Sequence, residues 1–187
     1  WSSDVCSSDL PLVNGEAVSL WLHGEHLLFE GRKMSKSSGN VILVSDLLNR
    51  GIDPLALRFC FMENNYRSQM DLSWDSLKAA HNLLSRLRKL YQEWATTPAL
   101  TTDLVEEFVS EIFADFRDDL DTPQAMIKLR SIERFEASPG EKRAIFEAID
   151  QLLGLDLLSK RQARPLPNEA IELLNKRAQA RLNKDFA

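Results

Sequence analysis

Two lysines, Lys33 and Lys36, stand three positions apart in a run of small hydroxylated residues that ends in Gly-Asn. Lysine carries a compact point charge on a flexible stem, so it can follow a polyphosphate whose charge shifts during a reaction. Serine and glycine add hydrogen-bond donors and a backbone that can open and close. The run predicts a loop that holds ATP phosphates, with both lysines catalytic; a solvated Lys/Ser turn is the alternative. The residues expected to bind ATP are Lys33, Met34, Ser35, Lys36, Ser37, Ser38, Gly39 and Asn40.

A histidine shortly before this run, His23 in Trp21-x-His23, is a further candidate for nucleotide contact. A packed structural histidine on a strand is the alternative. The two cysteines, Cys6 and Cys60, have neither CxxC spacing nor a histidine cluster nearby. The sequence therefore predicts no metal site in this chain and no disulfide framework. Cys60 lies in an apolar run and is expected to be a small buried side chain.

Composition and charge limit the class of protein. The 187 residues are 44% hydrophobic with few Gly or Pro, which indicates a globular, helix-rich chain. The formal net charge of −5 gives no general attraction for nucleic acid, so contact with RNA must come from local basic patches. No apolar run is long enough to cross a bilayer, and we see no signal peptide or lipidation motif. We therefore expect a cytoplasmic monomer without membrane contact.

Short strands and a short helix flank the lysine run. The β-forming residues between positions 17 and 29 predict a hairpin or strand pair, with Gly24-Glu25 between its halves. After the run, Ser45 is expected to cap a short helix that Gly51 ends. The lysine run is therefore expected between a small β segment and the first helix.

A helical bundle is expected after this segment, so the predicted fold class is mainly α. Asp-Pro, Thr-Pro and Ser-Pro pairs give helix start signals, and apolar residues recur at steps of three and four. That spacing gives each helix one buried face. The expected helices cover residues 53–63, 73–96, 104–116, 122–132, 138–153 and 168–184.

The chain is expected to have four parts. Residues 1–10 repeat Ser-Ser-Asp-aliphatic without an amphipathic pattern and are expected to be a non-native leader. Residues 11–70 hold the lysine run, and residues 71–158 form the helical bundle. Residues 159–187 are expected to be a basic linker and a last helix.

Basic residues before and along the long helix form one candidate surface for RNA phosphates. Each contributes affinity with little sequence specificity, and ordinary exposed helix positions are the alternative for any single residue. Residues 103–121 carry eight acids and one base, so they are expected to form a solvated outer face. The residues expected to contact RNA are Arg58, Arg67, Arg86, Arg88 and Lys89.

The run from Lys33 to Ser37 matches, letter for letter, the signature loop of class I aminoacyl-tRNA synthetases. The flanking segments resemble the cysteine–tRNA ligase family in order and spacing. Two positions depart from the family pattern: Leu55 replaces an acid, and Asn65 stands where histidine is frequent. The segments that carry the resemblance are Trp21–His23, Leu55–Arg58, Tyr66–Gln69, Asp118–Pro123 and Arg181–Ala187.

The resemblance implies ATP-dependent activation of cysteine and its transfer to tRNA(Cys), with ATP and Mg²⁺ as substrate. It implies that residues 11–70 end a catalytic domain and include a stem-contact segment, and that residues 71–158 form a tRNA-binding bundle. The family's His-x-Gly-His element and its zinc ligands have no match in this chain. The chain is therefore expected to be a C-terminal portion, truncated at both ends and inactive alone. ATP and cysteine would be bound through the missing half.

Two other functions remain as alternatives. A related ligase joins cysteine to an amino-sugar pseudodisaccharide by the same adenylate chemistry and without RNA. The resemblance to that family ends near Leu157, so the basic helix expected from Asn168 favours the tRNA enzyme. The third possibility is a non-catalytic helical interaction module that carries the lysine run by chance.

Overall fold

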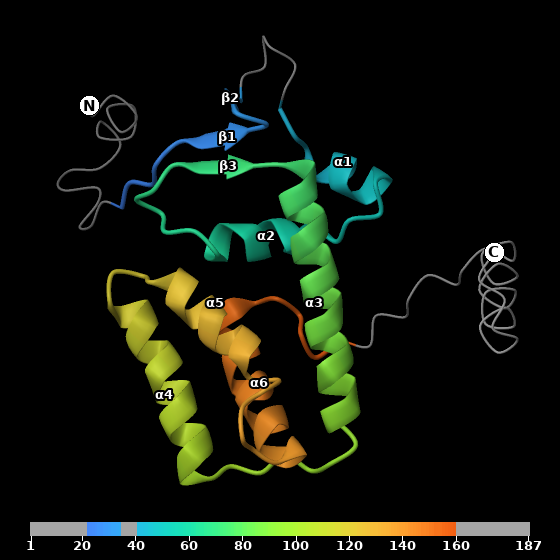
Figure 1. The fold of residues 1–187 in the computed structure, drawn as a ribbon, viewed down its shortest axis with the longest axis vertical. Coiled ribbons are helices and arrows are strands. Elements are labelled where there is room, and N and C mark those ends of the chain that lie inside the picture. Colours follow the sequence, from blue (N-terminus) through green and yellow to red (C-terminus); the bar gives the residue numbers. More distant parts are fainter. Residues whose placement is uncertain (1–21, 35–40, 160–187) are drawn as a thin grey trace, which may run out of the picture.

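A computed structural model describes residues 22–34 and 41–159 of the chain. A small sheet and two short helices lie at one end, and four longer helices form the remainder (Figure 1). The long helix α3 runs from the sheet end into the bundle (Figure 1). The expected fold class, mainly α with a short β segment before a bundle, is confirmed.

Three short strands form the sheet in the order β2-β1-β3. Strand β1 (Leu27–Phe29) pairs antiparallel with β2 (Arg32–Lys33) and parallel with β3 (Met70–Leu72). The hairpin turn is Glu30-Gly31, with φ angles of 51° and 72°. A two-residue turn with both φ angles positive matches the twist of a hairpin. The prediction of Gly24-Glu25 as the turn was wrong, because those residues lie in a coil that leads into β1.

Helix α1 (Val44–Asn49) is short and begins two residues before the position predicted. Its cap residue is Leu43, whose N–H donates to the Asp46 carboxylate at 2.8 Å. Asp46 therefore closes the first turn, and Ser45 lies inside the helix instead of capping it. The helix is followed by Gly51 with φ 72°, as the sequence predicts.

Helix α2 (Pro54–Met62) starts as predicted, with Asp53 as its cap and Pro54 at the first position. The Asp53 carboxylate accepts from the Leu55 N–H at 3.0 Å. Helix α3 (Trp74–Trp94) begins after the Ser73 cap, and its buried stripe confirms the predicted apolar period. The stripe includes Leu77, Ala80, Leu84, Leu87 and Tyr91.

The remaining bundle helices are α4 (Asp103–Arg117), α5 (Thr122–Ser131) and α6 (Pro139–Leu153). Their start signals behave as predicted: Asp121 accepts from the Gln124 N–H, and Ser138 caps α6. Gly154 ends α6 with φ 59°. The predicted helix over residues 168–184 lies outside the described residues.

The buried side chains form one cluster that extends from the sheet into the bundle. Helix α3 packs against α2 at one end and α6 further along, while α4 packs against α5 and α6. Among the described residues, no helix is long and apolar enough to span a membrane. The expected part boundaries at residues 10, 70 and 158 stay predictions.

Candidate functional site

The lysine run leaves the sheet through β2. Lys33 is exposed on this strand and pairs in register with Leu28. Met34, the next residue, is half-buried against the core cluster. Residues 35–40, which include Lys36 and the other residues expected to bind ATP, lie outside the described residues. The structure therefore shows the entry to this run and the residues after it.

Three hydrogen bonds hold the hairpin turn that precedes Lys33. The Glu30 N–H donates to the Leu72 carbonyl at 2.9 Å, and the Gly31 N–H donates to the Asp71 carboxylate at 2.9 Å. The Glu30 carboxylate accepts from the Trp74 N–H at 3.0 Å, at the first turn of α3. The base of the run is thereby fixed to β3 and to the start of α3.

The residues after the run are tied to the same place. Ile42 packs against the core cluster, and Arg50 at the end of α1 lies over the Trp74 ring, 3.8 Å from its centroid. Trp74 also packs edge-on against Phe29 of β1 at 5.6 Å. A guanidinium over an indole face is a favourable cation–π contact. Trp74 thus contacts the strand β1 that precedes the run and the end of the helix α1 that follows it.

His23 is exposed in the coil before β1 and does not lie on a strand as predicted. Two residues later the Glu25 N–H donates to the Tyr66 carbonyl at 2.7 Å, which fixes this coil beside the segment between α2 and β3. The proposed contact of His23 with a nucleotide stays a prediction.

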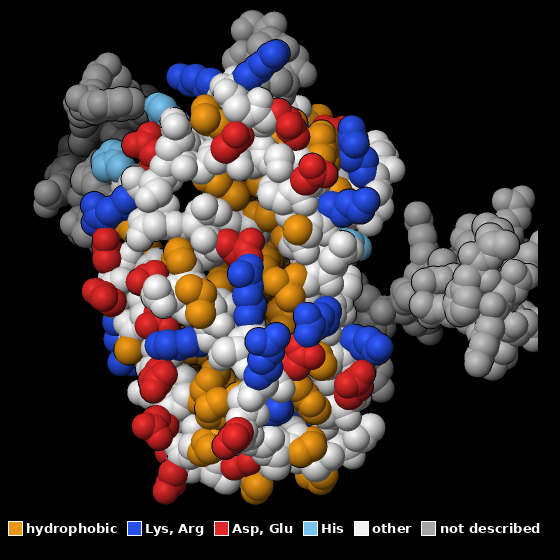
Figure 2. Space-filling model, viewed as in Figure 1, with side chains coloured by type: hydrophobic (Ala, Val, Ile, Leu, Met, Phe, Trp, Pro, Cys, Tyr) orange, Lys and Arg blue, Asp and Glu red, His pale blue; other side chains and the backbone are white. Residues whose placement is uncertain are grey.

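The five basic residues expected to contact RNA differ in burial. Arg58, Arg67, Arg86 and Lys89 are exposed, whereas the Arg88 residue is only 6% exposed. On the face shown in Figure 2, Lys and Arg side chains lie among acidic ones over the bundle, and acids line the edge formed by α4. The basic residues therefore do not form a patch of one sign on this face.

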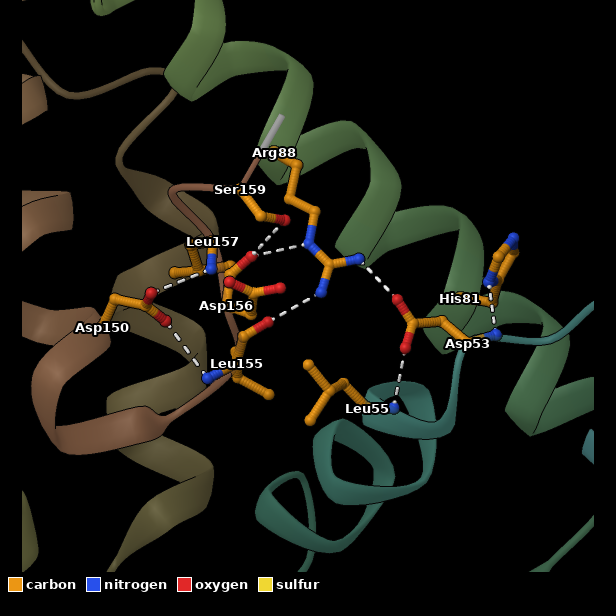
Figure 3. A network of polar contacts seen from close by, with 9 residues as sticks. All are labelled: Asp53, Leu55, His81, Arg88, Asp150, Leu155, Asp156, Leu157 and Ser159. Atoms are coloured by element: carbon orange, nitrogen blue, oxygen red, sulfur yellow. Dashed lines mark hydrogen bonds and ion pairs between the residues drawn. The ribbon is translucent and has the colours of Figure 1, made fainter. Parts of the chain in front are cut away.

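Arg88 is turned into the protein, where its guanidinium joins three segments (Figure 3). It donates to the Asp53 carboxylate at 2.6 Å and to the carbonyls of Leu155 and Asp156 at 2.9 and 2.8 Å. The Asp53 N–H in turn donates to His81 Nδ1 at 3.0 Å. A guanidinium with these internal partners is not available to phosphate. We correct the prediction for Arg88, which instead connects α3 to the start of α2 and to the segment after α6.

The sequence did contain a signal for this burial. Position 88 follows Leu84 by four residues and precedes Tyr91 by three, so it lies on the apolar stripe of α3. The partners could not be found in the same way, because Asp53 and Leu155 are far from Arg88 in sequence. His81, to which the sequence assigned no role, belongs to the same network (Figure 3).

Arg67 holds one carboxylate with two nitrogens. Its Nε and Nη2 donate to the two oxygens of Asp119 at 2.7 and 3.0 Å, and the Tyr66 hydroxyl donates to the same carboxylate at 2.6 Å. These hydrogen bonds lower the pKa of Asp119 from 3.8 to about 2. Of the acids before α5, Asp121 caps that helix, whereas Asp119 bridges to the segment between α2 and β3.

Arg58 and Arg86 have one internal partner each. The Arg58 Nε donates to the Leu153 carbonyl at 2.6 Å, in the last turn of α6. A cation at this place also interacts favourably with the negative end of the α6 dipole. Arg86 forms an exposed ion pair with Glu133. Both side chains keep solvent-facing surface, so their predicted contact with RNA stays a prediction, as does that of Lys89.

No group of three or more His, Cys, Asp or Glu side chains within residues 22–34 and 41–159 is arranged to hold a metal ion. Cys60 is buried as predicted, and burial raises the pKa of its thiol to about 11. A thiol in that state is a poor metal ligand. The described residues therefore do not fit the zinc that the resemblance implies for the family.

Comparison with known proteins adds an independent line of evidence. Residues 4–82 match the family described as "tRNA synthetases class I (C) catalytic domain". This match includes the lysine run and the sheet. It begins at residue 4, inside the segment that the sequence predicts to be a non-native leader. That interpretation of residues 1–10 stays a prediction.

Several curated relatives match about nine tenths of the chain. It is 36% identical over 177 residues to Cysteine--tRNA ligase 1 of Burkholderia lata, a match that covers 92% of this chain and 36% of that protein. It is 35% identical over 188 residues to Cysteine--tRNA ligase of Thermus thermophilus (89% and 39%). It is 30% identical over 190 residues to Cysteine--tRNA ligase of Staphylococcus carnosus (91% and 41%). The chain thus spans about two fifths of each relative, and it belongs to the cysteine–tRNA ligase family of class I aminoacyl-tRNA synthetases.

Proposed function

We propose that this chain supplies the phosphate-binding loop and an RNA-binding bundle to an enzyme that activates cysteine with ATP and transfers it to tRNA(Cys). In the first step the carboxylate of cysteine attacks the α-phosphate, the bond to the β-phosphate oxygen breaks, and pyrophosphate leaves. Lys33 and Lys36 neutralise the charge that builds on the leaving group. This is electrostatic stabilisation of a transition state and needs no covalent intermediate on the protein.

The observation that carries the proposal is the anchored hairpin that leads into the lysine run. The turn before Lys33 is fixed to β3 and α3, and the residues after the run are tied to Trp74 by Arg50. A fixed turn and strand give Lys33 one position from which it can meet a phosphate. Such positioning is what phosphoryl and adenylyl transfer require.

The remaining parts of the site are proposed on the resemblance. ATP would enter with Mg²⁺, and Met34, Ser35, Ser37, Ser38, Gly39 and Asn40 would line the phosphate side with the two lysines. Binding of cysteine and of the adenine end of ATP is assigned to portions that the relatives possess beyond the matched region. Residues 1–187 alone are expected to catalyse no ATP–pyrophosphate exchange.

The test uses cysteine-dependent ATP–pyrophosphate exchange in a protein that joins this chain to the catalytic portion of its relatives. Lys36→Ala should lower the exchange rate by about 100-fold, the usual scale for loss of one transition-state contact. The affinity for tRNA(Cys) should stay within about twofold. Lys78→Ala, on α3, serves as a control and should leave the rate unchanged. A Lys36→Ala protein that loses tRNA affinity but keeps its exchange rate would contradict the assignment.

A further inference from the structure

The contacts of Tyr66, Arg67 and Asp119 point to an anion site that is already occupied by the protein's own carboxylate. Three donors converge on Asp119: the Tyr66 hydroxyl and two nitrogens of Arg67, at 2.6 to 3.0 Å. An arginine fork with a hydroxyl beside it suits a phosphate as well as it suits a carboxylate. All of this lies at the surface, where the Arg67 and Asp119 side chains are 65% and 52% exposed.

The backbone that carries both donors is fixed without help from Asp119. The Arg67 N–H donates to the Asn65 side chain at 2.9 Å, and the Ser68 N–H donates to the Asn65 carbonyl at 3.0 Å. The Tyr66 carbonyl accepts from the Glu25 N–H at 2.7 Å. The Arg67 guanidinium also lies over the Tyr66 ring, 5.0 Å from its centroid, which keeps the two side chains together. Both donors are therefore available to another anion that replaces the carboxylate.

Asp119 lies at the surface in a turn between two helices. Asp119 and the following Leu120 have φ angles of 51° and 56°, a region that aspartate tolerates and that is strained for leucine. The ion pair of Asp119 with Arg67 is exposed, so an anion in solution can compete for the guanidinium. The neighbouring acids are held by the helix ends: the Asp118 N–H donates to the Ala114 carbonyl at 3.0 Å at the end of α4, and the Asp121 carboxylate caps α5. Release therefore needs only a change of the Asp119 side chain.

We propose that Asp119 occupies the Tyr66–Arg67 fork in the absence of RNA and that a backbone phosphate of tRNA takes its place. This inference rests on the proposed function, because it assumes that the chain binds tRNA. It predicts that RNA must displace the Asp119 carboxylate before one of its phosphates can contact Arg67.

The experiment measures the affinity of the 187-residue chain for a tRNA(Cys) transcript at fixed salt. Asp119→Asn should raise the affinity about 5- to 10-fold, the scale of about one phosphate contact. Arg67→Gln should lower it by a similar factor. Adding Asp119→Asn to Arg67→Gln should then give no further change. Glu107→Gln, which removes the same unit of charge from an exposed position of α4, is the matched control and should change the affinity less than twofold.

Three results would overturn the inference. They are an unchanged or weaker affinity for Asp119→Asn, an equal gain in the Arg67→Gln background, and an equal gain for Glu107→Gln. The last two would mean that net charge alone acts. If Asp119→Asn fails to fold, the wild-type chain supplies the answer by NMR: saturating tRNA should shift the Arg67 Nε–H resonance and raise the pKa of Asp119. If neither the Arg67 Nε–H resonance nor the pKa of Asp119 changes, the inference is also overturned. No binding of tRNA by any variant at low salt would instead refute the proposed RNA function.

Discussion

Arginines that look alike in the sequence have different roles, and their partners decide which. The Arg88 guanidinium is enclosed by a carboxylate and two carbonyls, whereas that of Arg67 shares one exposed carboxylate with a tyrosine. Arg86 pairs with one exposed acid. A buried charge must keep its partners because water cannot replace them, but an exposed pair can exchange with solvent or ligand. Removal of Arg88 should therefore affect folding, and removal of Arg67 should affect binding.

At Arg88 the expected effect is on stability. Arg88→Ala removes the charged partner of the Asp53 carboxylate, which is 8% exposed, and one donor to each of the Leu155 and Asp156 carbonyls. Loss of one partner of a buried pair costs about 3–5 kcal/mol of unfolding free energy. Lys89→Ala removes a neighbouring exposed charge and should change stability by less than about 0.5 kcal/mol. Urea unfolding followed by circular dichroism measures both, and equal values for the two variants would contradict the internal role of Arg88.

At Asp119 the expected effect is on titration. The Arg67 and Tyr66 hydrogen bonds hold its pKa at about 2, below the ordinary 3.8. A depressed pKa means that the pair's contribution to stability is complete above about pH 4 and disappears as the pH falls toward 2. Carboxyl ¹³C NMR should give a midpoint near 2 in the wild-type chain and a higher midpoint in Arg67→Gln, still below 3.8 because the Tyr66 hydroxyl continues to donate. A midpoint that does not move would show that Arg67 is not the cause.

At the scale of elements, most helix starts could be read from sequence and the hairpin could not. Asp53-Pro54, Ser73 and Ser138-Pro139 are local signals, since a cap bonds to a backbone N–H two or three residues away. The hairpin turn depends instead on Glu30 accepting a positive φ, which its bonds to β3 and α3 stabilise. Those partners lie more than 40 residues away, where no local pattern reports them. The partner of Arg67 was missed for the same reason.

A close contact between elements makes Gly140 essential in the first turn of α6. A Cβ atom at this position would lie 2.7 Å from the Pro98 carbonyl oxygen and 3.3 Å from the Leu100 Cβ. The Leu100 N–H also donates to the Gly140 carbonyl at 3.0 Å, so the connection from α3 to α4 lies directly on this turn. Glycine thus permits a backbone approach that any side chain would prevent.

Gly140→Ala should therefore destabilise the chain, although alanine usually favours a helix by about 1 kcal/mol. The clash is with backbone, which must move, and overpacking of this kind costs roughly 1–3 kcal/mol. Gly24→Ala is the matched control, because its nearest heavy atom, the Tyr66 carbonyl oxygen, would lie at an ordinary 3.7 Å. Thermal unfolding of both variants checks this: a higher midpoint for Gly140→Ala would contradict the close approach.

At the scale of the whole molecule, α3 joins the sheet end to the bundle. Trp74 at its start packs on Phe29 of the sheet, and Trp94 at its end packs edge-on to Phe146 of α6 at 5.2 Å. Between them, Arg88 bonds to the start of α2 and to the segment after α6. The buried core is continuous from the sheet into the bundle. The base of the lysine run and the bundle should therefore fold as one cooperative unit.

The two tryptophans allow a direct measurement of that cooperativity. Two variants that keep only Trp74 or only Trp94, with the other tryptophans changed to phenylalanine, report by fluorescence on opposite ends of α3. Two-state unfolding requires the two urea transitions to coincide. Leu84→Ala, at a fully buried position in the middle of α3, should lower the unfolding free energy by about 2–5 kcal/mol and shift both transitions together. A shift confined to the Trp94 signal would mean that the sheet, which leads into the lysine run, folds independently of the bundle. RNA bound to the bundle could then not stabilise the sheet through α3.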